Sequence, residues 1–127
     1  MLNSQASAAT MTSLIDAASC ANTAAATSGS GKWLDVRPYD GEILVVQQIG
    51  AVTGSITGKL QSATDANGTG AADITGATFT LVNSANNTQT IALDPKKVTG
   101  GFLGYVGTIV TGPALTSVTA GGKKKYV

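Results

Sequence analysis

Short runs of alternating apolar and polar residues, separated by Gly-, Asn- and Thr-rich turns, dominate this chain from Ile56 onward. In the run Ser55–Gln61, for example, Ile56, Gly58 and Leu60 fall on one side and polar residues fall on the other. A two-residue period is that of a β-strand with one buried face, because successive side chains of a strand point to opposite faces. The chain as a whole contains about eight strand-like runs at spacings of about 8–12 residues. We therefore expect an all-β fold, a single β-sandwich or jelly-roll-like domain of about eight antiparallel strands.

The apolar positions of these runs define the predicted core. Residues 42–49 form the most apolar run, with four consecutive apolar residues at 43–46. We predict a central strand there that is buried on both faces or lies at a subunit contact. The core residues that we predict are Ile43, Val45, Ile56, Leu60, Phe79, Leu81, Ile91, Leu93, Leu103, Tyr105 and Ile109.

The first 31 residues differ in composition from the rest of the chain. They are rich in Ala, Ser, Thr and Asn, and Asp16 is their one charged residue. This composition is typical of a linker, so we expect an N-terminal arm over residues 1–31 and the β-sandwich over residues 32–127. Met11, Leu14 and Ile15 fall at helical spacing, which predicts a short helix near residues 12–20 within an otherwise extended arm.

Two interpretations of the arm stay open. It docks onto a neighbouring molecule through Met11, Leu14 and Ile15, or it is a disordered tail. Trp33 follows the arm and also has two interpretations. It is an interaction residue at the junction of arm and body, since Trp often dominates interface energetics, or it closes one end of the sandwich.

Charge and composition argue against several classes of function. Charged residues make up 12% of the chain and the net charge is +1, so no strong field directs it to nucleic acid or to a lipid surface. No apolar run approaches the ~18 residues of a membrane span. The N-terminus has no basic segment followed by an apolar run, so we expect no secretory signal. Lys123–Lys125 is a basic run with only Tyr126 as an aromatic neighbour, which favours a solvated edge or an acidic partner over nucleic acid.

Residues that could perform catalysis are few. The chain has no His and a single Cys, Cys20, so an internal disulfide is impossible and the thiol has no imidazole base. Asp35, Asp40 and Glu42 lie close in sequence, but turn residues are a simpler interpretation than a hydrolytic carboxylate pair. Residues 29–32 resemble the end of a phosphate loop without its following Ser or Thr. We expect no enzyme activity and no cofactor.

One loop is a weak candidate for a metal site. Asp65, Asn67 and Asp73 offer side-chain oxygens around a glycine-containing bend, a pattern that suits a hard cation such as Ca²⁺. The loop has Thr at the fifth position and no acidic residue at the twelfth. A Gly/Asn hairpin loop is therefore the simpler interpretation.

Several strand segments together resemble a known group of proteins. The segments are Leu60-Gln61-Ser62 with Asp65, Asp73-Ile74, Gly76-Ala77-Thr78-Phe79-Thr80, Ile91-Ala92-Leu93-Asp94, Phe102-Leu103-Gly104-Tyr105-Val106 and Lys124-Lys125-Tyr126-Val127. In this order they resemble small β-sandwich structural proteins of tailed bacteriophages, including capsid decoration or cement proteins. The resemblance covers roughly residues 34–127.

The resemblance implies a structural role in a virion, without enzyme activity or cofactor. On this basis we expect a decoration or cement protein that bridges subunits of the major capsid protein, assembles in the host cytoplasm and resides on the phage head. A homo-oligomer, with a trimer as the expected state, also follows from the resemblance. Two alternatives stay open: a tail, neck or head-fibre component, and a carbohydrate- or surface-binding β-sandwich module.

Overall fold

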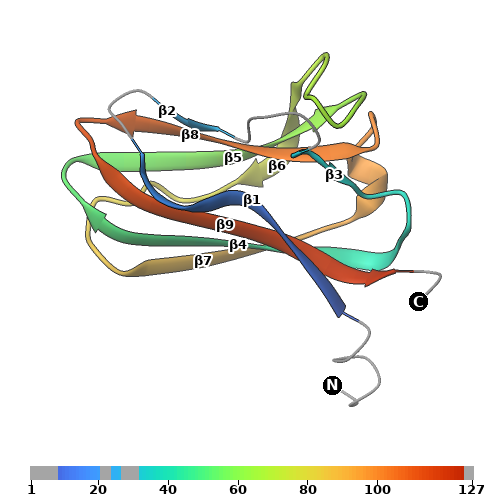
Figure 1. Ribbon diagram of the computed structural model, residues 1–127, viewed down its shortest axis with the longest axis horizontal. Coiled ribbons are helices and arrows are strands. Elements are labelled where there is room, and N and C mark those ends of the chain that lie inside the picture. Colours follow the sequence, from blue (N-terminus) through green and yellow to red (C-terminus); the bar gives the residue numbers. More distant parts are fainter. Residues whose placement is uncertain (1–8, 21–23, 27–31, 125–127) are drawn as a thin grey trace.

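Two antiparallel sheets packed face to face form this protein (Figure 1). The structure, a computed structural model, describes residues 9–20, 24–26 and 32–124. Its strands are β1 (Ala9–Cys20), β2 (Ala24–Ala26), β3 (Leu34–Asp35), β4 (Tyr39–Val52), β5 (Ser55–Ala63), β6 (Ala72–Thr78), β7 (Asn87–Leu93), β8 (Phe102–Val110) and β9 (Ala114–Lys124). A 3₁₀ turn, η1 (Pro95–Lys97), precedes β8. The predicted all-β sandwich is confirmed.

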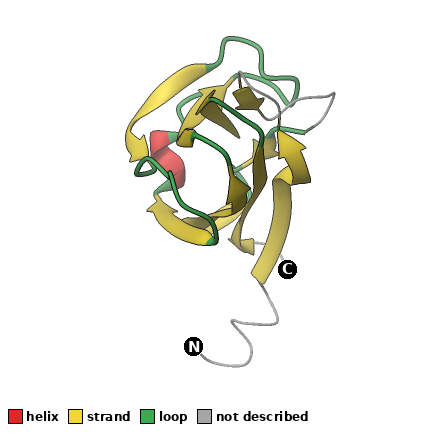
Figure 2. Ribbon diagram, turned by 90° about the vertical axis from the view of Figure 1, so that its left-hand side faces the viewer, coloured by secondary structure: helices red, strands yellow, loops and turns green. Residues whose placement is uncertain are grey.

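The first sheet has the strand order β1-β9-β4-β7, and the second has the order β2-β8-β5-β6. The short strand β3 pairs with β8 on the edge that β2 also uses, at the opposite end of β8. Figure 2 shows the two sheets as curved layers around the interior. Strand β9 continues through Gly121 and Gly122: its pairing with β4 extends to Gly121 and, after a register shift, resumes at Lys123.

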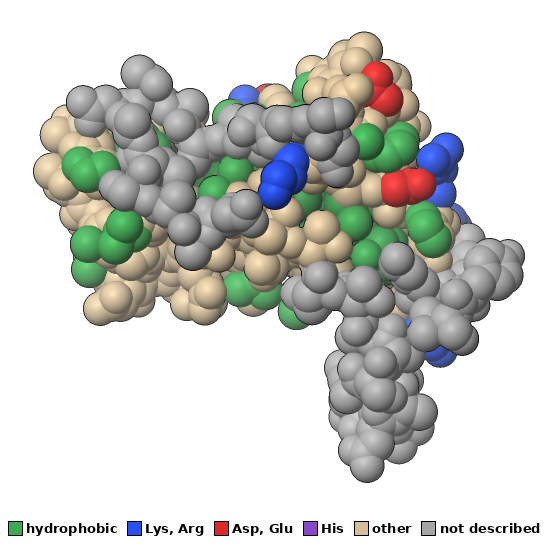
Figure 3. Space-filling view, viewed as in Figure 1, with side chains coloured by type: hydrophobic (Ala, Val, Ile, Leu, Met, Phe, Trp, Pro, Cys, Tyr) green, Lys and Arg blue, Asp and Glu red, His purple; other side chains and the backbone are tan. Residues whose placement is uncertain are grey.

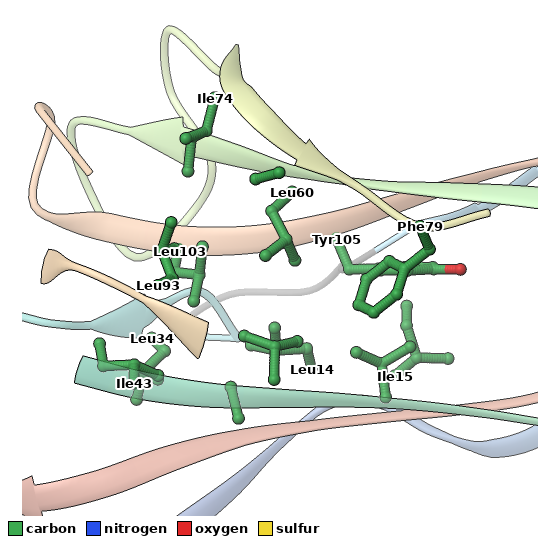
Figure 4. Packing of buried hydrophobic residues seen from close by; sticks show 14 of the residues in the cluster. Leu14, Ile15, Leu34, Ile43, Leu60, Ile74, Phe79, Leu93, Leu103 and Tyr105 are labelled. Atoms are coloured by element: carbon green, nitrogen blue, oxygen red, sulfur yellow. The ribbon is translucent and has the colours of Figure 1, made fainter. Parts of the chain in front are cut away.

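The core lies between the sheets, and the alternating pattern predicts most of it correctly. On β5, Ile56 and Leu60 point inward and are fully buried. Tyr105 of the neighbouring strand β8 pairs with Leu60, and Leu103 lies on the same inner face (Figure 4). Nine of the eleven predicted core residues are buried, and Ile91 packs against the core while partly exposed.

Leu81 is the exception, because the prediction that it points inward is wrong. Its side chain is 51% exposed, whereas Phe79 and Val82 are buried. The alternation fails because β6 ends at Thr78 and, after the hydrogen bond from the Phe79 N–H to the Gly58 C=O, pairing with β5 resumes at the Ile56–Val82 bridge. Between these points the side-chain amide of Gln89 binds both the N–H and the C=O of Thr80, at 2.8 and 2.9 Å.

The N-terminal arm is also different from the prediction. The predicted helix near residues 12–20 is wrong: residues 9–20 form β1, which pairs with β9 along its length. Leu14 and Ile15 are buried in the core cluster of the same chain (Figure 4). The described part of the arm is therefore an edge strand of the sandwich, which fits the expectation of an extended arm.

Strand β4 is central in the first sheet, between β9 and β7, but only one of its faces is buried. Ile43 and Val45 are inaccessible to solvent, whereas Leu44 is 44% exposed. The prediction of burial on both faces is therefore wrong within this chain. The alternative, a subunit contact on the second face, stays a prediction.

A hydrogen bond across the interior joins the two sheets. The Tyr105 hydroxyl on β8 donates to Gln47 Oε1 on β4, and both side chains are fully buried. Space for this pair comes from Gly58 on β5, where an added Cβ would overlap both Gln47 Oε1 and Tyr105 Oη. Glycine is required at Gly58 because nothing larger fits beneath the pair.

We predict that Gly58→Ala lowers the free energy of unfolding by about 1–3 kcal/mol, the usual cost of overpacking a core. Gly50→Ala is the matched control, because its Cβ would meet the exposed side chain of Leu115 at 3.3 Å. Urea denaturation measures both. Equal midpoints for the two variants would contradict the packing argument.

We predict that Leu14→Ala costs about 2–5 kcal/mol of stability, because truncating a buried leucine leaves a cavity. Leu14 is 3% exposed, and Leu115→Ala, at a leucine that is 45% exposed, is the control. Thermal unfolding of the full chain compares them. A dispensable arm would instead leave the melting temperature of Leu14→Ala at the wild-type value.

Candidate functional site

The charged residues are concentrated toward one end of the sandwich, and the other end is uncharged. Three long runs, residues 43–58, 74–93 and 98–122, contain no charged residue. The strand pairing brings their turns, at residues 52–55, 83–86 and 111–113, to one end, which we name the uncharged end. The described charged side chains lie toward the opposite, charged end. Figure 3 shows them away from the left-hand end of the molecule.

The uncharged end carries exposed apolar side chains. Leu81, Val110 and Leu115 are 51%, 62% and 45% exposed, and they lie on or beside its three turns. Val110 pairs with Ser55 of the neighbouring strand β5, and Leu115 packs beside Gly50. Exposed apolar groups without neighbouring charges are cheap to remove from water, so this end suits contact with another protein.

The outer face of the first sheet continues this uncharged surface. Register places its outward side chains in rows across β7, β4 and β9. The outer-face residues are Thr88, Thr90, Ala92, Leu44, Val46, Gln48, Leu115, Ser117 and Thr119. Among the described side chains of β7, β4 and β9 and their flanks, charged residues lie beyond the ends of these rows, at Glu42, Asp94 and Lys123. Across β7, β4 and β9 this face is mixed in polarity and free of charge, as the centre of a protein interface is.

The charged end is built from short-range ion pairs. Arg37 donates to both carboxylate oxygens of Asp35, at 2.9 and 2.8 Å, and its guanidinium lies 5.1 Å from the ring centroid of Phe102. The hydrogen bond and the charge of Asp35 raise the pKa of Arg37. Lys59 donates to Asp73 at 3.0 Å. Exposed pairs of this kind contribute little stability, so they mainly fix local geometry.

Two open clefts flank η1 at the charged end. The larger, of about 580 Å³, is lined by residues that include Tyr39, Glu42, Asp94 and Lys96. The second, of about 480 Å³, lies between the turn after η1 and the start of β6, near Asp73. Burial is the main cause of the raised pKa of Tyr39, which lines the larger cleft.

The carboxylates of the weak metal candidate, Asp65 and Asp73, accept hydrogen bonds from other groups of the chain. Asp65 Oδ1 accepts the backbone N–H groups of Asn67 and Thr69, and Oδ2 accepts the Thr69 hydroxyl at 2.6 Å. Asp73 is held by Gln61 and Lys59 instead. Within the described residues, no three acidic, His or Cys side chains are grouped for a metal ion. These bonds lower the pKa values of Asp65 and Asp73, with side-chain hydrogen bonds as the main cause.

Trp33 is buried, but outside the main core cluster. It is 7% exposed and covers Gly104 on the outer side of β8. The loop after β5 in turn covers Trp33. The backbone N–H of Trp33 donates to the C=O of Ala66 in this loop, and an added Cβ on Gly68 would stand 2.6 Å from Trp33 Nε1. Trp33 therefore fixes this loop onto the second sheet.

The remaining predicted residues have these places. Leu14 and Ile15 lie in the core, and the side chain of Met11 lies outside the described residues, as do those of Asp40 and Cys20. Lys32 and Lys123 are exposed. The surface residue that sequence reasoning missed is Leu115, for which the absence of charge over residues 98–122 was an available signal. Leu44 belongs to the run for which a subunit contact was one of the two predictions.

Comparisons with protein-family models, curated proteins and solved structures gave no significant match to this chain. Among the described residues, none of the helical structure is long and apolar enough to cross a membrane.

We predict that Thr69→Val raises the pKa of Asp65 toward its ordinary value of 3.8, because the hydroxyl bond favours the carboxylate. A lowered folded-state pKa means that this stabilisation is present above about pH 4 and is lost as pH falls through the lowered value. Carboxyl NMR titration measures the shift, and Thr69→Ser is the control that keeps the hydroxyl. An unchanged pKa in Thr69→Val would contradict the assigned cause.

Proposed function

We propose that this chain is a bacteriophage virion structural protein that decorates or cements the head by bridging subunits of the major capsid protein. The observation that carries the proposal is the concentration of charged residues toward one end of the sandwich, which leaves the other end uncharged. A broad uncharged surface with exposed leucines is costly to leave in water and suits a permanent contact. The resemblance of residues 34–127 to phage β-sandwich proteins is the reason for proposing the major capsid protein as the partner.

The proposed mechanism is mechanical. A protein that spans a joint between two capsid subunits adds buried apolar area, at about 25 cal/mol per Å² before the costs of association. The uncharged end and the outer face of the first sheet would make this contact, since exposed Leu44 and Leu115 lie there. The ion pairs of the charged end would face solvent and keep the decorated particle soluble.

Residues 9–20 have a different role in this proposal from the one that the composition suggested. Because β1 completes the first sheet and buries Leu14 and Ile15, the described arm stabilises the body of the protein. Shell binding is therefore assigned to the uncharged surface, and the arm is not needed as a separate anchor.

We predict that Leu115→Asp weakens binding to empty phage heads by about tenfold or more, because a carboxylate would have to be desolvated in the contact. Co-sedimentation of the purified chain with heads, over a range of chain concentrations, measures the affinity and the number of copies per particle. Many copies per head support decoration, and a few copies indicate a neck or head-fibre position.

Thr75→Asp is the matched control, because Thr75 is exposed on β6 at the charged end. It should bind as the wild type does. Circular dichroism checks that both variants keep the sheet. Binding that survives Leu115→Asp but not Thr75→Asp would transfer the contact to the charged end, and a wild-type chain that ignores all heads would overturn the proposal.

A further inference from the structure

The sheets have four open edges, and three of them carry a feature that discourages pairing with another strand. Strands β2 and β3 are three and two residues long. Strand β6 carries Asp73, a glycine with positive φ at Gly76 and a register shift against β5. Strand β1 has two register shifts against β9. Short, charged or bulged edges of this kind resist edge-to-edge association.

Strand β7 has none of these features. Its seven residues, Asn87–Leu93, contain no charge, Pro or Gly, and they pair with β4 from Leu93–Ile43 to Asn87–Ile49 without a register shift. Within the described residues, the strand has no backbone partner on its other side. A regular and uncharged edge is a template for one more strand.

We propose that the free edge of β7 pairs with β7 of a second copy of this chain, antiparallel and about a two-fold axis. The pairing would join the two first sheets into one continuous sheet of eight strands. It concerns the chain alone, so it does not depend on the proposed binding to a phage head.

The charge at the two ends of β7 favours a second copy in this orientation. The turn after the strand holds Asp94, Lys96 and Lys97, whereas residues 83–86 before it are uncharged. Antiparallel pairing places the charged turn of each copy beside the uncharged turn of the other. A parallel arrangement would place like charges together, which is unfavourable.

The strand also matches itself in side chains. Full overlap of Asn87–Leu93 centres the pair on Thr90, so that Thr90 faces its own copy on the exposed face and Thr88 faces Ala92. Cross-strand threonine pairs are favourable on a sheet surface. Gln89 points to the other side, where its amide already binds Thr80, and it leaves the backbone edge open.

Sedimentation equilibrium of the purified chain over a concentration series tests the contact. We expect a reversible dimer, and we expect Thr90→Lys to raise its dissociation constant about tenfold or more, because two lysines would face each other on the axis. Thr108→Lys is the matched control on β8, exposed and in a strand, and should dimerise like the wild type. A monomer at every concentration, a trimer, or equal effects of the two variants would overturn the proposal.

Disulfide trapping tests the register, and it also covers the case in which Thr90→Lys fails to fold. In a Cys20→Ser background, Thr90→Cys places two thiols directly across the axis, with Cβ atoms about 4.5–5.5 Å apart, close to disulfide distance. Thr88→Cys places its two copies about 13 Å apart along the strands, out of reach. Covalent dimer from Thr90→Cys alone supports the pairing. Dimer from neither variant, or equally from both, would overturn it.

Discussion

The hydrogen bond between Tyr105 and Gln47 sets the spacing of the two sheets on which the rest of the structure depends. Both side chains are buried between β8 and β4, and Phe79 packs against Tyr105 with ring centroids 6.0 Å apart. A buried hydroxyl without a partner would cost about 1–3 kcal/mol, so the pair penalises any sliding of one sheet over the other. Gly58 leaves the space that the pair occupies, which makes the arrangement specific to this register.

Because the core side chains are buried between the sheets, the outer faces and the turns make the contacts with other molecules. The ion pairs Arg37–Asp35 and Lys59–Asp73 belong to the charged end or lie toward it. The described outer face across β7, β4 and β9, with Leu44 and Leu115, carries no charge. A monomer leaves the exposed apolar side chains of the uncharged surface in water, which lowers its solubility. An assembled protein can bury that surface and expose the charged end. The neutral surface is therefore the basis of the proposed role in an assembly.

Simple alternation in the sequence predicts the strands that run without interruption, such as β5 and β8, and most of the core. It fails where the ladder is irregular. In β1, register shifts on either side of Ile15 place Leu14 and Ile15 both inward, and two adjacent buried residues imitate a helical pattern. Leu81 is misassigned because the chain leaves the ladder between Thr78 and Val82. The place of Trp33 depends on Gly104 and Gly68, two distant glycines whose role no local pattern shows.

The candidate surface was partly visible in the sequence, since three long runs without charge can be read directly. The open edge of β7 was not visible in the sequence, because whether a strand lies at an edge depends on the strand order of the whole sheet. Residues 87–93 and 43–49 are both uncharged and β-forming, yet β4 is covered on both sides by β9 and β7, and β7 is covered on one. An edge as regular as β7 is a hazard for a protein that stays alone. Its persistence beside three protected edges is understandable if the strand is paired in the assembled state.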